Sequence, residues 1–366
     1  MSPWSQCVVE NMSARGFRIT VVHFTYSTDT YITSESDPVR HSLAALRTRV
    51  DGVHTVATPG SLIGRVAMGA YHLRRIVRGV RPSAVLTLYG GTNAAVAWSS
   101  GIRPYIVYVV GSDVLLASGV RRLASRAALR HAAVVLANGQ HLAESARKLA
   151  PGARVQPLYL GIDTARFRPP SHRARAPHFV CTRGFGHLYD NATIVRAMAA
   201  LSDPPADFRM CFVSGGPELA RSIALADELI APPARANVEF VGGTSRDGLL
   251  DTLDWGSFYL SASVSDGASI SLLEALACGL FPIVSDIPAN REWIVHGENG
   301  LLFPVGDHVE LARCIEQALA GIPWMATALQ TNRSLVLERA ELDASMTRLA
   351  GVVEQHLPRQ SGHRSD

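Results

Sequence analysis

The chain has 366 residues, of which 47% are hydrophobic and 18% are charged, and it contains five cysteines. This length exceeds the roughly 250 to 300 residues that one hydrophobic core supports, so it predicts two domains, and the composition is that of a globular protein. No stretch approaches the ~18 uninterrupted apolar residues of a membrane-spanning helix. The scattered cysteines lack the paired spacings of a zinc site or a disulfide framework.

The charge is unevenly distributed along the chain. Up to residue 165 there are 18 Arg and Lys against 8 Asp and Glu, and the remainder has 17 against 23. Arginines recur at helical spacing in two segments, one with Arg74, Arg75, Arg78 and Arg81, the other with Arg121, Arg122, Arg126 and Arg130. Each set alone fits a solvated helix face. Together they predict an anionic partner, and a membrane surface or a phosphorylated acceptor fits better than nucleic acid, because no aromatic-rich binding module accompanies them.

The first half of the chain reads as parallel βαβ units. A helix is predicted over Trp4–Arg15, and short β-branched runs then alternate with Ala- and Leu-rich helical patterns. The strands expected here are Arg18–Phe24, His54–Thr58, Val85–Leu88, Tyr105–Val109, Ala133–Leu136 and Val155–Tyr159. No strand precedes the first helix, so either the sheet lacks its usual first strand or the given start is internal to a longer protein. The opening residues also lack the features of a secretory signal, which predicts a cytoplasmic location, at most peripheral to the inner membrane face.

The second half repeats this pattern after a Pro- and Arg-rich connection, GIDTARFRPPSHRARAPH. Its expected strands are His178–Cys181, Arg209–Val213, Val238–Val241, Phe258–Leu260 and Phe281–Val284. The patterns predict two doubly wound α/β domains, an N-terminal one over residues 1–165 and a C-terminal one over residues 166–335. Residues 336–366 are expected to form a helix that packs back on the N-terminal domain and ends in a frayed tail.

Two carboxylates flank a Gly-containing loop in the second half. Asp266 precedes the loop, and Glu274 lies in the first turn of a helix expected to begin at about Ser271, with seven residues between the two acids. The loop and helix start supply Gly267, Ala268, Ser269, Ile270 and Ser271. Unsatisfied backbone N–H groups and the helix dipole favour a diphosphate at such a position. A purely structural interpretation also stays open. Ser271 and Glu274 fit a capping box, and Asp266 and Gly267 fit a turn.

This block resembles the donor-site signature of family 4 glycosyltransferases, in which two acidic residues separated by seven others flank a Gly-rich loop. The segments LLEALACG, FPIVSDI, NREWI and HGENGLLF follow in the order and spacing of that family, and GIDTARFRPP resembles its interdomain segment. The similarity runs from about Ser83 to the C-terminal helix and is weakest at the N-terminus.

The resemblance implies a GT-B fold, two Rossmann-like domains with a cleft between them, and a retaining hexosyltransferase of glycan or glycoconjugate biosynthesis. A nucleotide-diphosphate sugar would be held by the C-terminal domain and the acceptor, a sugar, lipid-linked or small molecule, by the N-terminal one. Glu274 would bind the ribose hydroxyls, and Asp266 would contact the sugar and stabilise the transition state. Asp266 stands where the family more often has Glu, as in a subfamily with Asp-Gly-Ala-Ser in this loop.

The resemblance also assigns residues outside this loop. Arg183 in CTRGFGHLYDN would face the donor diphosphate and neutralise its charge, so neither a metal nor another cofactor is expected. The family's Lys is missing, with Leu188 or Tyr189 in its region, and His187 is a partial substitute.

Three further positions are candidates. The glycines Gly215 and Gly216 would let the backbone approach the base. In the N-terminal half, Asp113 after an apolar strand is a candidate contact to the sugar or acceptor, with a helix N-cap as the equally open alternative.

Two other functions stay open. A catalytically silent partner of the same fold would explain the missing Lys and Val110 in place of the family's His, whereas the intact Asp266, loop and Glu274 argue against it. A sugar-nucleotide epimerase or a phosphorylase would need acid/base side chains or a cofactor lysine that the sequence does not place.

Overall fold

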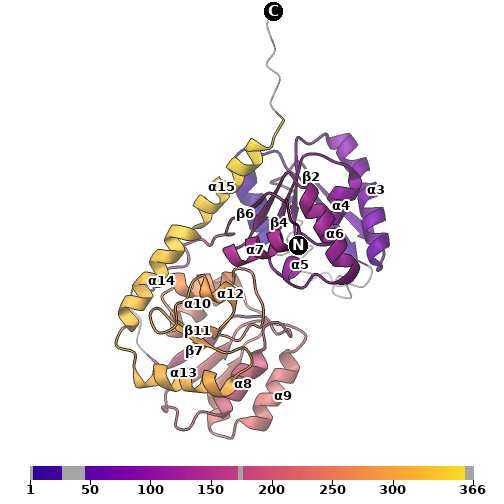
Figure 1. Ribbon diagram of the computed structural model, residues 1–366. Helices are drawn as coiled ribbons and strands as arrows, with labels where there is room; N and C mark the ends of the chain where they lie inside the picture. The colour runs from indigo at the N-terminus through magenta and orange to yellow at the C-terminus, as the bar shows by residue number, and fades with distance from the viewer. Residues whose placement is uncertain (1–2, 27–45, 172–175, 359–366) are drawn as a thin grey trace, which may run out of the picture. The chain divides into compact units, whose positions relative to one another are not determined.

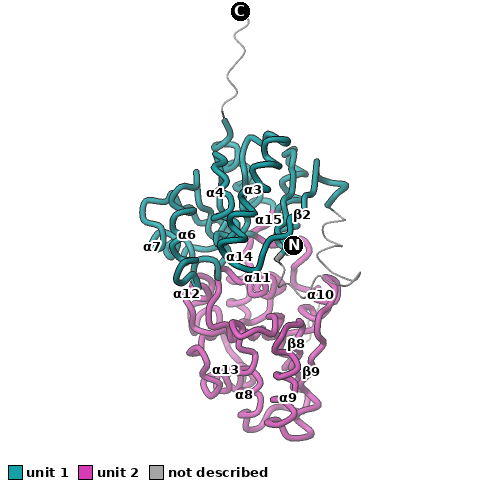
Figure 2. Tube along the Cα trace, turned by 90° about the vertical axis from the view of Figure 1, so that its right-hand side faces the viewer, with its two compact units in different colours: residues 1–160, 343–366 teal, residues 161–342 magenta. Residues whose placement is uncertain are grey.

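The computed structural model describes residues 3–26, 46–171 and 176–358, and the predicted frayed tail lies outside them. The chain divides into two compact units, residues 1–160 with 343–366 and residues 161–342 (Figure 2). The dividing points therefore lie at Leu160 and Leu342 rather than at residues 165 and 335. No helix in the described ranges is long and apolar enough to cross a membrane.

Unit 1 is built on parallel strands (Figure 1). Four of them form a sheet in the order β3-β4-β5-β6, with β3 at Val85–Leu88, β4 at Tyr105–Val109, β5 at Val134–Ala137 and β6 at Val155–Pro157. The strands β1 (Thr20–Tyr26) and β2 (Gly52–Thr58) form a separate parallel pair. Every residue of β4 and β5 is buried, as expected for strands covered by helices on both faces.

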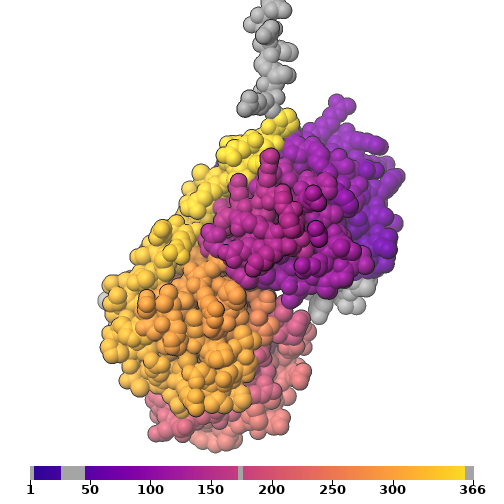
Figure 3. All heavy atoms as spheres, in the orientation of Figure 1, coloured from indigo at the N-terminus to yellow at the C-terminus, as the bar shows by residue number. Residues whose placement is uncertain are grey.

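The helices of unit 1 are α1 (Pro3–Ala14), α3 (Leu62–Val80), α4 (Thr92–Ser100), α5 (Ser112–Leu115), α6 (Gly119–His131), α7 (Gln140–Leu149) and most of α15 (Leu342–Gln355). The buried helix α4 packs between α3 and α6. In the space-filling view the part of the chain that carries α6 lies at the surface (Figure 3). The C-terminal helix joins unit 1 through Arg15, whose guanidinium donates to the carbonyl and the carboxylate of Asp343.

Unit 2 has one six-stranded parallel sheet. Its strands are β7 (His178–Cys181), β8 (Arg209–Phe212), β9 (Val238–Phe240), β10 (Phe258–Ser261), β11 (Phe281–Ser285) and β12 (Leu301–Phe303). Their order, β12-β11-β10-β7-β8-β9, is the 3-2-1-4-5-6 order of dinucleotide-binding folds. Phe258 pairs with Phe179 across β10 and β7, and their rings stack with centroids 4.5 Å apart.

The helices of unit 2 are α8 (Asn191–Ala199), α9 (Leu219–Leu229), α10 (Arg246–Trp255), α11 (Ile270–Ala277), α12 (Pro288–Arg291), α13 (His308–Ala320) and α14 (Met325–Arg339). Strands and helices thus alternate in both units, so the predicted α/β class is confirmed. The sheet order reverses between β7 and β10, and ligands of doubly wound folds bind at that point, beyond the carboxyl ends of the strands.

Candidate active site

Three loops of unit 2 meet at the reversal point of its sheet. Arg183 follows β7, Asp266 follows β10, and Gly215 follows β8. Since β8, β7 and β10 are neighbours and all parallel, their carboxyl ends lie at one edge. The fold therefore brings together residues that are far apart in the sequence.

Arg183 is the centre of a buried polar cluster. Its Nη1 donates to Ser269 Oγ at 2.8 Å and Ser271 Oγ at 3.0 Å, and its Nη2 donates to Asp266 Oδ2 at 2.5 Å. Burial by itself lowers the pKa of the guanidinium, but the Asp266 carboxylate opposes this, and the pKa lies above its ordinary value. The guanidinium is therefore a fixed positive charge in a buried site, and its Nε has no partner among the described residues.

Tyr189 completes this cluster in the region where the resemblance leads one to expect a Lys. The Arg183 guanidinium lies over its ring, 4.3 Å from the centroid. Such stacking orients a guanidinium without neutralising it. His187, the predicted partial substitute for the Lys, is exposed and makes no hydrogen bond to a described residue.

The predicted capping box at Ser271 and Glu274 is wrong. Ser269 is the N-cap of α11, and its Oγ accepts a hydrogen bond from Leu272 N at 3.2 Å. Ser271 is the second helical residue, and its hydroxyl contacts Arg183 and the Tyr259 hydroxyl instead. Glu274 is therefore not needed to cap the helix.

The start of α11 presents free backbone donors. The Gly267 N–H donates to Asp266 Oδ1 at 2.8 Å. The amides of Ser269, Ile270 and Ser271 have no acceptor among the residues that the structure describes. Three such donors at the positive end of a helix dipole, beside a guanidinium, form a site for an anion.

Glu274 is a buried acid without a hydrogen bond to any described residue. Its residue is 7% exposed, and burial raises the pKa of its carboxyl to about 7, with Arg246 opposing that rise in part. An unpaired buried carboxylate costs stability, so it is more often retained for function than for folding.

The two glycines after β8 hold neighbouring loops together. Gly216 has a φ of +151°, and a Cβ there would lie 2.3 Å from the Phe185 carbonyl oxygen. Phe185 N donates to Gly215 O at 3.0 Å. The close approach that requires Gly216 is thus to the Phe185 backbone, which fixes the loop that carries Arg183.

Asp113 belongs to unit 1 and joins two of its loops. Its carboxylate accepts hydrogen bonds from Gly90 N at 2.5 Å, Gly111 N at 2.8 Å and Val110 N at 3.2 Å. The N-cap of α5 is Gly111, so the alternative that Asp113 is itself the cap is wrong. Burial raises the pKa of Asp113, and the backbone donors lower it in part.

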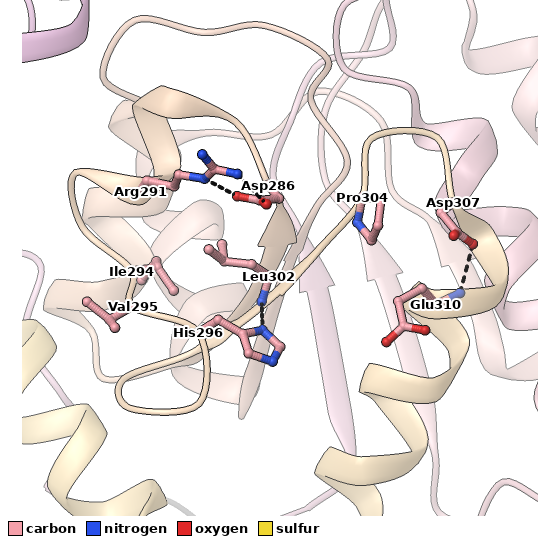
Figure 4. A pocket seen from close by; sticks show the side chains of 9 residues that line it. All are labelled: Asp286, Arg291, Ile294, Val295, His296, Leu302, Pro304, Asp307 and Glu310. Atoms are coloured by element: carbon pink, nitrogen blue, oxygen red, sulfur yellow. Dashed lines mark hydrogen bonds and ion pairs between the residues drawn. The ribbon is translucent and has the colours of Figure 1, made fainter.

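A separate groove of about 630 Å³ lies beyond β11 and β12 (Figure 4). Its lining includes the ion pair of Asp286 and Arg291 as well as His296, whose Nδ1 accepts from Leu302 N. The hydrogen bond from Arg291 lowers the pKa of Asp286. None of the predicted site residues lines this groove. The described residues contain no group of three or more side chains suited to hold a metal ion.

Part of the chain matches a family of glycosyltransferases. Residues 177–321 match the family model described as "Glycosyl transferases group 1". The Bacillus subtilis (strain 168) protein described as "Putative glycosyltransferase EpsD" is 29% identical over 180 residues, which are 46% of this chain and 46% of that protein. The chain thus aligns with about half the length of this relative.

Solved structures are similar over nearly the whole chain. Sucrose-phosphate synthase from Thermosynechococcus elongatus has a TM-score of 0.77 at 18% identity, covering 95% of this chain and 91% of that one. Anabaena HepE in complex with UDP-glucose has a TM-score of 0.76 at 14% identity, covering 97% and 96%. The predicted GT-B fold class is confirmed, and residues 177–321 are similar to the group 1 glycosyltransferases.

Proposed function

We propose that this chain is a retaining family 4 glycosyltransferase that moves a hexosyl group from a nucleotide-diphosphate sugar to a glycan, lipid-linked or small-molecule acceptor. The observation that carries the proposal is the cluster of Arg183, Asp266 and the free amides at the start of α11. HepE, which shares the fold, has been crystallised with UDP-glucose.

The donor diphosphate is assigned to the start of α11 and to Arg183. The leaving diphosphate gains negative charge as the glycosidic bond breaks, and a fixed guanidinium with oriented N–H groups stabilises that charge without reorganisation. In the structure Arg183 is engaged by Asp266, so a bound diphosphate would share or replace that ion pair. Asp266 would then be released toward the sugar, where its charge stabilises the positive character of the transition state.

The nucleoside is assigned to Glu274. Ionised, this carboxylate can accept two O–H bonds from a ribose, and donor binding would supply the partners that it lacks among the described residues. The site chemistry requires no metal, because Arg183 and the α11 dipole supply the positive charge. The acceptor is assigned to unit 1, and the excess of positive charge there favours an anionic membrane surface as a peripheral contact at the cytoplasmic face.

The test is donor cleavage by purified protein with UDP-, GDP- and ADP-sugars, followed as release of nucleoside diphosphate, with product anomer determined by NMR. Asp266→Asn should reduce the rate by roughly 100-fold or more, the range found for removing one transition-state contact. Glu298→Gln, at an exposed acid of the same unit, is the control and should retain full activity. Undiminished cleavage by Asp266→Asn, or an inverted product anomer, would contradict the proposal, and cleavage of no donor would favour the silent partner.

A further inference from the structure

Helix α6 exposes apolar side chains at its first turn. Val120 and Leu123 are each 66% exposed, and Leu116, just before the helix, is 48% exposed. Large aliphatic side chains exposed together on one surface mark an interaction site more often than isolated ones do.

Arginines continue the same face of α6. At 3.6 residues per turn, Arg126 and Arg130 continue the side of Val120 and Leu123, opposite the buried Ser125 and Ala128. Arg122 lies at the edge of this side, near the buried Leu129. The three side chains are exposed and make no hydrogen bond or ion pair to a described residue. The face therefore combines an apolar tip with free positive charge.

Carboxylates are few around this face. Residues 92–149, which include the neighbouring helices α4 and α7, contain six arginines and one lysine against two acids. These are Asp113, whose carboxylate is engaged by backbone amides, and the exposed Glu144 of α7. A second copy of this chain meeting the face would place arginines against arginines, which is unfavourable. Nucleic acid would match the charge but leave the aliphatic tip without a partner.

The α3 arginines singled out in the sequence are less free. The Arg74 guanidinium donates to the carbonyls of Ser100 and Ser99, and Arg81 ends the helix in a left-handed conformation. Arg75 and Arg78 remain exposed. The structure thus favours α6 over α3 as the contact surface.

We propose that the exposed face of α6, defined by Leu116, Val120, Leu123, Arg122, Arg126 and Arg130, docks unit 1 on an anionic lipid bilayer. The aliphatic side chains enter the interface between headgroups and acyl chains, and the guanidiniums bind lipid phosphates around them. This face is the surface that makes the membrane contact proposed above. Its binding to lipid does not depend on the transfer chemistry of unit 2.

The test is sedimentation of the full chain with phosphatidylcholine vesicles with and without phosphatidylglycerol. Wild type should bind only the anionic vesicles and be released by salt. Val120→Gln with Leu123→Gln should weaken binding by roughly tenfold or more, since the aliphatic burial is lost. Arg122→Gln, Arg126→Gln and Arg130→Gln together should weaken it by roughly fivefold per arginine and flatten the salt dependence.

The matched control is Arg75→Gln with Arg78→Gln on α3, which removes charge from the same unit and should weaken binding less than any α6 variant. Circular dichroism and donor-induced thermal stabilisation, both expected to be unchanged, verify that the variants fold. The proposal is overturned if wild type ignores anionic vesicles at low salt, or if the α3 variant loses as much binding as the α6 variants. Loss of donor cleavage with retained vesicle binding would instead contradict the proposed function alone.

Discussion

Replacement of Glu274 by Gln should stabilise the folded protein at alkaline pH. Burial raises the pKa of Glu274 from its ordinary 4.5 to about 7, and Arg246 offsets only part of that effect. When a group has a higher pKa in the folded than in the unfolded state, its contribution to stability is fully present at pH values below the unfolded-state pKa. That stability is lost as the pH rises through the folded pKa. The loss therefore falls between about pH 4.5 and pH 7.

The size of this loss of stability follows from the rise in the pKa of Glu274. Ionisation of Glu274 lowers the free energy of unfolding by about 3 kcal/mol at pH 8 and by about 1 kcal/mol at pH 5. Gln has nearly the same size and no charge, so it avoids this loss. Glu274→Gln should thus exceed wild type by up to about 3 kcal/mol at pH 8 and by about 1 kcal/mol at pH 5.

Denaturant unfolding followed by circular dichroism at both pH values measures this difference. The exposed Glu298→Gln is the matched control and should follow wild type at both. A Glu274→Gln protein that is about 1 kcal/mol less stable than wild type at pH 8 would show instead that Glu274 stabilises the helix as a cap, because that is the effect of losing a helix cap.

Three further predictions concern the same unit. Gly216→Ala should lower stability by about 1 to 3 kcal/mol, since its φ is +151° and a Cβ would meet the Phe185 backbone at 2.3 Å. Gly215→Ala, where a Cβ meets nothing within 4 Å, should unfold like wild type, and equal effects of the two in thermal unfolding would contradict this account. Donor affinity measured by calorimetry should weaken as the pH falls through about 7, because protonated Glu274 loses acceptor capacity, and the Glu274→Gln variant should not show that dependence. EDTA should leave donor cleavage nearly unchanged, whereas full loss restored by magnesium or manganese would show that Arg183 and the α11 amides do not suffice.

Most of the fold could be predicted from hydrophobic patterning. The strands Val85–Leu88, Tyr105–Val109 and His178–Cys181 coincide with the predicted ones, because each is a short apolar run bounded by polar or turn residues. The strand Leu301–Phe303 was not predicted, although the strands Val155–Pro157 and Val238–Phe240 are equally short and were. Its position depends on pairing with β11 and not on its own sequence.

The residues of the site could be named from the sequence, but not their pairing. Arg183 and Asp266 are 83 residues apart, and their contact depends on β7 lying next to β10 in the sheet. The start of α11 was misplaced because Ser269 and Ser271 both suit an N-cap, and only the backbone geometry selects Ser269. The stacking of Arg183 on Tyr189 could not be predicted, because the sequence shows only that a Tyr lies in the region where a Lys is expected.

Some residues in the segments that resemble family 4 glycosyltransferases stabilise the fold. The buried Asn299 donates to Asn332 Oδ1 at 2.7 Å and to Trp293 O at 2.8 Å, which fixes the HGENG turn against α14. Asn290 donates to Ser285 O at 2.7 Å and closes the turn after β11. Motif matching alone does not separate these residues from Arg183, Asp266 and Glu274.

The loops after β7 and β10 of unit 2 should bind a nucleotide-diphosphate sugar through Glu274 and Arg183. This binding is measured by calorimetric titration of wild type and Glu274→Gln with the donor selected from UDP-, GDP- and ADP-sugars. Because Glu274→Gln is expected to be the more stable protein, a loss of affinity cannot be attributed to unfolding. Wild type should bind one donor per chain, and the variant should bind at least roughly tenfold more weakly, as expected when buried hydrogen bonds to a charged group are lost. Equal affinity of the two proteins would contradict this prediction.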